Sequence, residues 1–205
     1  TAEGAGDSRD AGAASLAQSD LFGATPVMPG ADHLVGGVAP VPAGTVHLSV
    51  LPLFHVGGTS YSLVAWAGGA PIFMMRQPDP LGALQMLERE RITHTFYVPA
   101  LMAAMTQVRG DKVFDFSALQ AVSYGASPMP LPVMRACLQL FPKGTMQQVY
   151  GMTEQSGVVT VLPPEDHENP AVAHRLVSAG KVIHGVEIEI RDPATTAPVR
   201  LVACA

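Results

Sequence analysis

Strand-like and helix-like segments alternate at least four times along this chain, and that alternation restricts the folds it can adopt. Apolar runs rich in β-branched residues are followed by segments with helical spacing, and short links rich in Gly and Pro join them. Such chains form βαβ units, because the chain needs a crossover to return to the start of the next parallel strand. We therefore expect an α/β fold with a mainly parallel sheet and flanking helices.

The expected elements occupy the middle of the chain. The sequence predicts strands over 46–51, 70–75, 93–98, 119–124, 146–150, 158–162 and 182–190. It predicts helices over 57–67 and at Pro80, Pro99 and Pro130, because proline is favoured at helix starts. Residues 1–44 show no sustained period, so we expect an irregular segment there, a partial domain over 45–192 and a divergent tail over 193–205.

Charge and composition exclude several functional classes. A formal net charge of −5 provides no basic surface for nucleic acid. The uncharged run Val56–Met75 is interrupted by glycines and Pro71, so we expect a helix and a short strand there and no transmembrane span. Two cysteines cannot form a disulfide framework, and the first residues do not resemble a secretory signal. These features favour a cytoplasmic location.

The loop Gln148–Glu154, with the sequence QVYGMTE, carries groups suited to a nucleotide. Gly151 allows a sharp turn close to a ligand, and the Thr153 hydroxyl can donate to a phosphate oxygen. The Glu154 carboxylate suits Mg²⁺ held partly by substrate phosphates, and the Tyr150 ring can pack on a base or an acyl group. An ordinary strand–turn with a helix-starting glutamate fits the same residues, so both interpretations stay open.

A second loop, Tyr124–Pro128, has small residues directly after an expected strand. Gly125, Ala126 and Ser127 leave room for a flat ligand, whose edge the backbone N–H and C=O groups can contact. A tight turn that needs small residues is the alternative. A serine hydrolase is disfavoured, because the G-x-S-x-G motif around Ser127 fails at Met129.

A third loop, PLFHVGG, places His55 between apolar neighbours where a strand meets a helix. None of the seven histidines has the spacing of a known metal-binding motif. Taken alone, His55 is more typical of a structural histidine than of a functional one.

Together, PLFHVGG, YGASPMP and QVYGMTE resemble the adenylate-forming acyl-CoA synthetases in order and spacing, as does the later segment Ser178–Ile190. The resemblance runs from about 46 to 192 and implies a two-step reaction. ATP and a carboxylic acid, of the fatty-acid type, give an acyl-adenylate, and coenzyme A then takes the acyl group. Because these steps depend on positioning and charge neutralisation, loops that offer hydroxyl, carboxylate and backbone groups suit them.

The resemblance also implies roles for single residues. Gly125, Ala126 and Ser127 would line the adenine pocket, and Tyr150 and Gly151 would flank it. Thr153 would contact the α-phosphate, Glu154 would hold Mg²⁺, and His55 would lie at the acyl pocket near the pantetheine entry. Tyr124 stands where many relatives have glycine, so we expect it to narrow the acyl pocket.

Other parts depart from the family pattern. Residues 1–45 contain neither the phosphate loop nor any lysine, and the Y-x-T-G-D motif and the C-terminal domain with its lysine are not found. We therefore expect a fragment with little turnover, because each lost donor lowers the rate by about 10²–10³-fold. A non-catalytic adenine-nucleotide-binding module is the alternative, and self-association through exposed apolar surface is expected.

Overall fold

A computed structural model describes residues 42–155, 157–183 and 186–199. The expected irregular segment 1–44 lies outside these residues except for 42–44, and the expected tail 193–205 is described as far as 199. The strands are β1 (His47–Ser49), β2 (Ile72–Met74), β3 (His94–Tyr97), β4 (Ala121–Gly125), β5 (Met146–Met152), β6 (Gly157–Leu162) and β7 (Lys181–Val182). The helices are α3 (Val56–Ala67), α4 (Pro80–Arg89), α5 (Pro99–Arg109), α6 (Leu131–Leu140), α7 (Pro164–Glu168), and two 3₁₀ segments, η2 (Thr153–Gln155) and η3 (Pro170–Val177).

The described strands form one sheet with the order β2-β1-β3-β4-β5-β6-β7. The first five strands in that order are parallel, while β6 pairs antiparallel with β5 and with β7. The expected α/β class with a mainly parallel sheet is therefore confirmed. Because the chain moves outward to β2 and then back past β1 to β3, the strand order reverses between β1 and β3.

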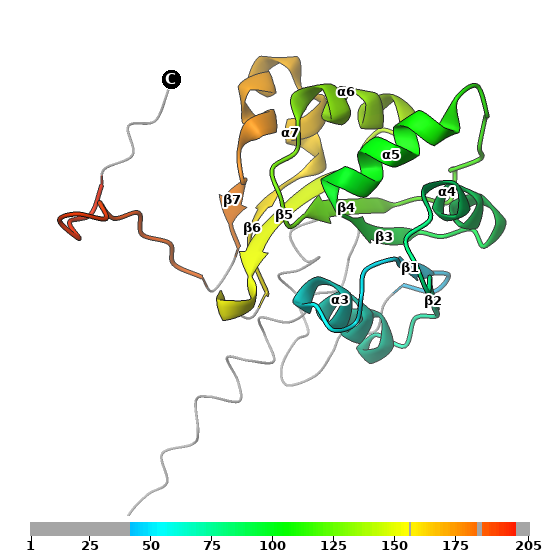
Figure 1. The fold of residues 1–205 in the computed structure, drawn as a ribbon, viewed down its shortest axis with the longest axis horizontal. Coiled ribbons are helices and arrows are strands. Elements are labelled where there is room, and N and C mark those ends of the chain that lie inside the picture. Colours follow the sequence, from blue (N-terminus) through cyan, green and yellow to red (C-terminus); the bar gives the residue numbers. More distant parts are fainter. Residues whose placement is uncertain (1–41, 156, 184–185, 200–205) are drawn as a thin grey trace, which may run out of the picture.

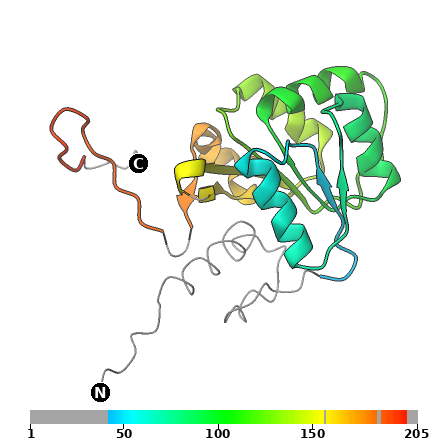
Figure 2. The ribbon, with the colours of Figure 1, turned by 60° about the horizontal axis from the view of Figure 1, so that its bottom comes forward.

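Helices lie on both faces of the sheet (Figure 1). Helix α3 covers one face near β1 and β2, and α4, α5 and α6 cover the other (Figures 1 and 2). Side chains alternate between these faces along each strand, as in any β-strand. On β1, Leu48 packs into the core under α4–α6, whereas the neighbouring His47 contacts Tyr61 of α3.

The helix starts follow from local sequence. The Asp79 carboxylate accepts a hydrogen bond from the Leu81 N–H at 3.2 Å, and Pro80 occupies the first helical position of α4. Its apolar stripe then buries Leu84 and Leu87 in the main core. Pro99 occupies the first helical position of α5, where no side chain caps the helix, so these prolines mark helix starts as predicted.

One expected strand is wrong. The alternation over 182–190 predicted a half-exposed strand, but β7 ends at Val182 and no strand is assigned within 186–190. Ile188 and Ile190 are 44% and 48% exposed, and among the described residues no strand pairs with 186–190. Alternation alone does not make a strand, since a strand also needs a neighbour to pair with.

Candidate functional site

A cavity of about 490 Å³ opens at the carboxyl ends of the central strands, on the face covered by α3. It lies where the strand order reverses between β1 and β3, which is where open α/β sheets bind ligands. Each of the three predicted loops contributes to its wall, through His55, Ala126 and Gly151. The remaining wall is mostly apolar, with residues such as Leu51, Phe96, Val98, Val149 and Val158.

The first loop brings His55 to the cavity at the N-terminus of α3. His55 takes the N-cap position with extended backbone angles and makes no capping hydrogen bond, and its exposed ring lies against the Phe54 ring, with centroids 4.7 Å apart. A Cβ at Gly58 would lie 2.2 Å from the Pro52 carbonyl oxygen, so only glycine lets the helix start this close to the preceding loop. The local sequence therefore fixes His55 at the cavity edge.

The second loop follows β4. A Cβ at Gly125 would lie 2.2 Å from the carbonyl oxygen of Val149 on β5, so glycine allows the two strand ends to approach. Ala126 then adopts a left-handed φ of 69° and lines the cavity. Such a backbone costs about 1–2 kcal/mol for a residue other than glycine. Ser127 is exposed and lies outside the cavity wall.

The third loop links β5 to β6. Gly151 lines the cavity at a point where the strand register shifts, and Met152 beside it also contributes to the wall. Thr153 and Glu154 follow in η2 with exposed side chains, beyond the cavity wall itself. Tyr150 is 43% exposed and does not line the cavity. Thr153 and Glu154 thus come directly after wall residues, at the rim.

Tyr124 does not lie where the sequence analysis expected it. Its neighbour Ser123 lines the cavity, so the Tyr124 ring lies on the opposite face of the sheet, where it is fully buried. Its hydroxyl is 2.8 Å from Nε2 of His167 and donates to Oε1 of Gln148 at 3.3 Å. Burial raises the pKa of Tyr124 well above its ordinary value. Tyr124 therefore does not narrow this cavity.

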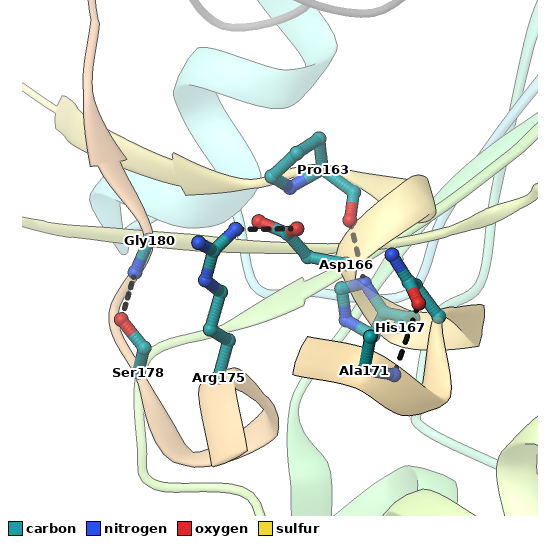
Figure 3. Close-up of polar contacts among 8 residues, drawn as sticks. Pro163, Asp166, His167, Ala171, Arg175, Ser178 and Gly180 are labelled. Atoms are coloured by element: carbon teal, nitrogen blue, oxygen red, sulfur yellow. Dashed lines mark hydrogen bonds and ion pairs between the residues drawn. The ribbon is translucent and has the colours of Figure 1, made fainter. Parts of the chain in front are cut away.

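The region between β6 and β7 was not predicted. It contains α7 and η3, which Figure 3 shows with their polar contacts. The Arg175 guanidinium donates to Asp166 at 3.1 Å, and the His167 Nδ1 lies 2.8 Å from the Pro163 carbonyl oxygen. Pro164 followed by two acidic residues is a helix-start signal that could have revealed α7.

The sequence also did not predict a buried pair of histidines under α3. His47 on β1 and His94 on β3 are paired in register, and their rings stack with centroids 5.1 Å apart. Burial, together with a smaller effect of the nearby His94, lowers the pKa of His47 to about 3. Burial also lowers the pKa of His94 to about 4. Both rings are therefore neutral at physiological pH. No signal in the separate strands shows that they meet.

Within the described ranges, no group of three or more His, Cys, Asp or Glu side chains could hold a metal ion. Among the same residues, no helix combines the length and the hydropathy needed to cross a bilayer.

Comparison with known proteins agrees with this geometry. The sequence pattern of the AMP-binding enzyme family matches residues 27–202, which extends past the expected bounds of 45–192 at both ends. A 4-coumarate–CoA ligase of Oryza sativa subsp. japonica is 33% identical over 155 residues, which cover 75% of this chain and 27% of that protein. A medium/long-chain-fatty-acid–CoA ligase of Mycobacterium tuberculosis is 32% identical over 141 residues, which cover 68% of this chain and 24% of that protein. The chain spans about a quarter of the length of these relatives.

Solved structures show the same fold. The O-succinylbenzoate coenzyme A synthetase of Bacillus subtilis, in complex with ATP and a magnesium ion, superimposes with a TM-score of 0.64 at 25% identity. The match covers 77% of this chain and 31% of that one. An amide bond synthetase of Marinactinospora thermotolerans has a TM-score of 0.69 at 24% identity, and the match covers 80% of this chain and 32% of that one. At this identity, the match supports the fold alone. On these matches, the chain belongs to the AMP-binding enzyme family, the adenylate-forming acyl-CoA synthetases.

Proposed function

We propose that this chain forms the acid- and adenylate-binding region of an AMP-forming acid–thiol ligase. In that reaction a carboxylate oxygen attacks the α-phosphorus of ATP, and pyrophosphate leaves. The thiol of coenzyme A then attacks the acyl carbon, and AMP leaves. The observation that carries the proposal is the convergence of three family-like loops on one cavity at the reversal of strand order.

The nucleotide belongs at the strand-end loops. Gly125 and Ala126 bring backbone groups to the cavity edge, where an adenine ring fits against small side chains. Ser127 completes this adenine loop, and Tyr150 and Gly151 flank the base from β5. The Thr153 hydroxyl, which is exposed, would donate to the α-phosphate.

Glu154 is the proposed magnesium ligand. Its carboxylate is exposed in η2, just beyond the cavity wall, where phosphate groups of a bound nucleotide would lie. Mg²⁺ is commonly held by one or two carboxylates together with substrate phosphates and water. One carboxylate at the rim fits that pattern. When bound, the ion would neutralise charge on the phosphates.

The acid belongs in the apolar body of the cavity, with its carboxylate toward His55 and the strand-end loops. Side chains such as Phe96, Val149 and Val158 surround this space, so a substrate with an apolar alkyl or aryl body fits it. Fatty acids, as expected from the sequence, and 4-coumarate, from the names of relatives, are both substrates to test. We propose coenzyme A as the acceptor, approaching past His55.

We further propose that the chain alone binds an acyl-adenylate but turns over slowly. Among the described residues, no lysine or arginine lines the cavity, so nothing there supplies positive charge to the leaving pyrophosphate. Losing one preorganised donor typically lowers a rate by about 10²–10³-fold. Pyrophosphate release from ATP, Mg²⁺ and a panel of fatty and aryl acids measures this turnover, and robust turnover would contradict the proposal.

Calorimetric binding of AMP and of ATP with Mg²⁺ tests the site itself. Thr153→Ala should weaken both nucleotides, whereas Glu154→Ala should weaken only ATP with Mg²⁺. Glu165→Ala, which removes an exposed carboxylate on α7, is the matched control. Binding that neither site variant alters would refute the proposed nucleotide site. Nucleotide binding with no added affinity from an attached acyl group would instead favour the non-catalytic nucleotide-binding module.

A further inference from the structure

Two methionines among the described residues are exposed at the surface. Met74 of the edge strand β2 is 42% exposed, and Met152 at the end of β5 is 43% exposed. Other methionines, such as Met102 and Met134, are fully buried. Oxidants convert methionine to its sulfoxide when they can reach the side chain. Met74 and Met152 are therefore the described methionines that an oxidant in solution reaches first.

The two exposed methionines differ in their relation to the cavity. Met152 contributes to the cavity wall, whereas Met74 does not. In the register of β5 and β6, the residue opposite Met152 is Gly157, which also lines the cavity. In the described part of the chain, a Cβ on Gly157 would have no atom within 4 Å other than those of its chain neighbours. Glycine thus leaves the space opposite Met152 open to a small oxidant.

Oxidation of the Met152 thioether by a hydroperoxide is a two-electron step. The sulfur lone pair attacks one oxygen of hydrogen peroxide, and an S–O bond forms as the O–O bond breaks. The proton on the transferred oxygen moves to the departing hydroxide, which leaves as water. The sulfur is oxidised by two electrons and the peroxide is reduced by two. The product sulfoxide is polar and accepts hydrogen bonds, whereas a thioether is only a weak acceptor.

A sulfoxide at Met152 would be poorly matched to this part of the cavity. The neighbouring wall residues on β5 and β6 carry no side-chain hydrogen-bond donor; they are Val149, Gly151, Gly157 and Val158. In the free chain, water would solvate the sulfoxide oxygen, because Met152 is exposed. A bound ligand with an apolar body would displace that water and leave the oxygen unpaired, which is unfavourable. Oxidation should therefore weaken ligand binding more than it disturbs the fold.

We infer that Met152 is a redox-sensitive modification site of the cavity, where a hydroperoxide lowers the affinity for an acyl-adenylate by forming the sulfoxide. The change is reversible, because methionine sulfoxide reductases restore the thioether. Met74 reacts as well, but it lies outside the cavity wall, so its sulfoxide should leave binding unchanged. This inference rests on the proposed function, which places an acyl-adenylate in this cavity.

The test treats the chain with hydrogen peroxide and then titrates an acyl-adenylate mimic, 5′-O-(N-decanoylsulfamoyl)adenosine, by calorimetry. Peptide mass spectrometry measures the oxidation of each methionine. Met152 and Met74 should oxidise at similar rates, because their exposed fractions match, and ahead of the buried Met102 and Met134. We expect about tenfold weaker binding by the oxidised chain, which is the effect of one acceptor left without its hydrogen bond. Methionine sulfoxide reductases that act on both epimers should restore the affinity.

Two leucine variants separate the effects of the two exposed methionines. Leucine keeps an apolar side chain of similar volume and has no sulfur to oxidise. Met152→Leu should keep its affinity through peroxide treatment, whereas Met74→Leu should lose affinity as the unaltered chain does. Each variant is compared with its own untreated sample, so a different affinity before treatment does not affect the result. The mimic, added before the peroxide, should protect Met152 from oxidation and leave Met74 unprotected.

Several results would overturn the inference and leave the proposed function standing. These are a Met152 that stays reduced while Met74 oxidises, unchanged affinity once Met152 is oxidised, and the same loss of affinity in Met152→Leu as in the unaltered chain. A mimic that does not bind the untreated chain overturns both the inference and the proposed function.

Discussion

Acid should destabilise this chain through the buried histidine pair. His47 and His94 are 2% and 3% exposed, and Nε2 of each ring has no hydrogen-bond partner among the described residues. Burial lowers their pKa values to about 3 and about 4, from 6.5 for an exposed histidine. A proton on either ring would place an unpaired charge between α3 and the sheet.

The direction of this pH effect follows from the difference in proton binding between the folded and the unfolded chain. Below about pH 6.5 the unfolded chain binds protons at these histidines and the folded chain does not, so stability falls as the pH falls. The full stability is present at a pH above the histidine pKa of the unfolded chain. It is lost progressively as the pH falls toward the pKa values of the two histidines in the folded chain. At about pH 5 each histidine lowers the free energy of unfolding by about 2 kcal/mol, and the pair by about 4 kcal/mol. That loss is large against a typical stability of about 5–15 kcal/mol.

Urea unfolding at about pH 7 and about pH 5 measures this loss. His94→Phe keeps an aromatic ring beside His47 and removes one titrating group. Between about pH 7 and about pH 5, the free energy of unfolding of this variant should therefore fall by about 2 kcal/mol less than that of the unaltered chain. His174→Phe replaces an exposed histidine and is the control. His167, whose pKa burial also lowers, contributes equally in all three proteins. The same loss in His94→Phe as in the unaltered chain would refute the reasoning.

Three further predictions concern stability and association. Asp79→Ala removes the N-cap of α4 and should lower the free energy of unfolding by about 1 kcal/mol, measured by urea titration; no change would mean that the cap is not formed. Tyr124→Phe leaves Nε2 of His167 without its hydroxyl partner and should cost about 1–3 kcal/mol, yet leave the choice of acid unchanged, since Tyr124 faces away from the cavity. A shifted acid preference in the pyrophosphate assay would contradict that placement. Leu63 and Trp66 are each 52% exposed on α3, so replacing both with lysine should reduce self-association in light scattering, and an unchanged mass would exclude this face as its cause.

Much of the fold could be predicted because its signals are local. The Asp79-Pro80 pair sets a helix start through backbone angles and one cap, and neither depends on distant residues. The segment 182–190 shows the opposite case. Its alternation is local, but whether it pairs depends on β6, whose ladder on that side reaches only Lys181 and Val182. Sequence patterns describe what a segment can do and do not identify its neighbour.

The candidate site also has some features that local sequence predicts and others that depend on distant residues. The strand-end loops could be predicted to meet, because parallel strands place their carboxyl ends together, and His55, Ala126 and Gly151 do line one cavity. Tyr124 was misplaced because a shift of one residue along a strand moves a side chain to the other face. Ser123 and Gln147 lie 24 residues apart, and only the register of β4 and β5 brings them together.

The alternation of faces along the central strands has a practical consequence for protein engineering. Ser123 and Phe96 contact the cavity, while their neighbours Tyr124 and Tyr97 are fully buried on the opposite side of the sheet. Mutant libraries aimed at new substrates can therefore randomise every second residue and leave the intervening ones untouched. Selectivity and folding robustness then become separately adjustable within the same few strands.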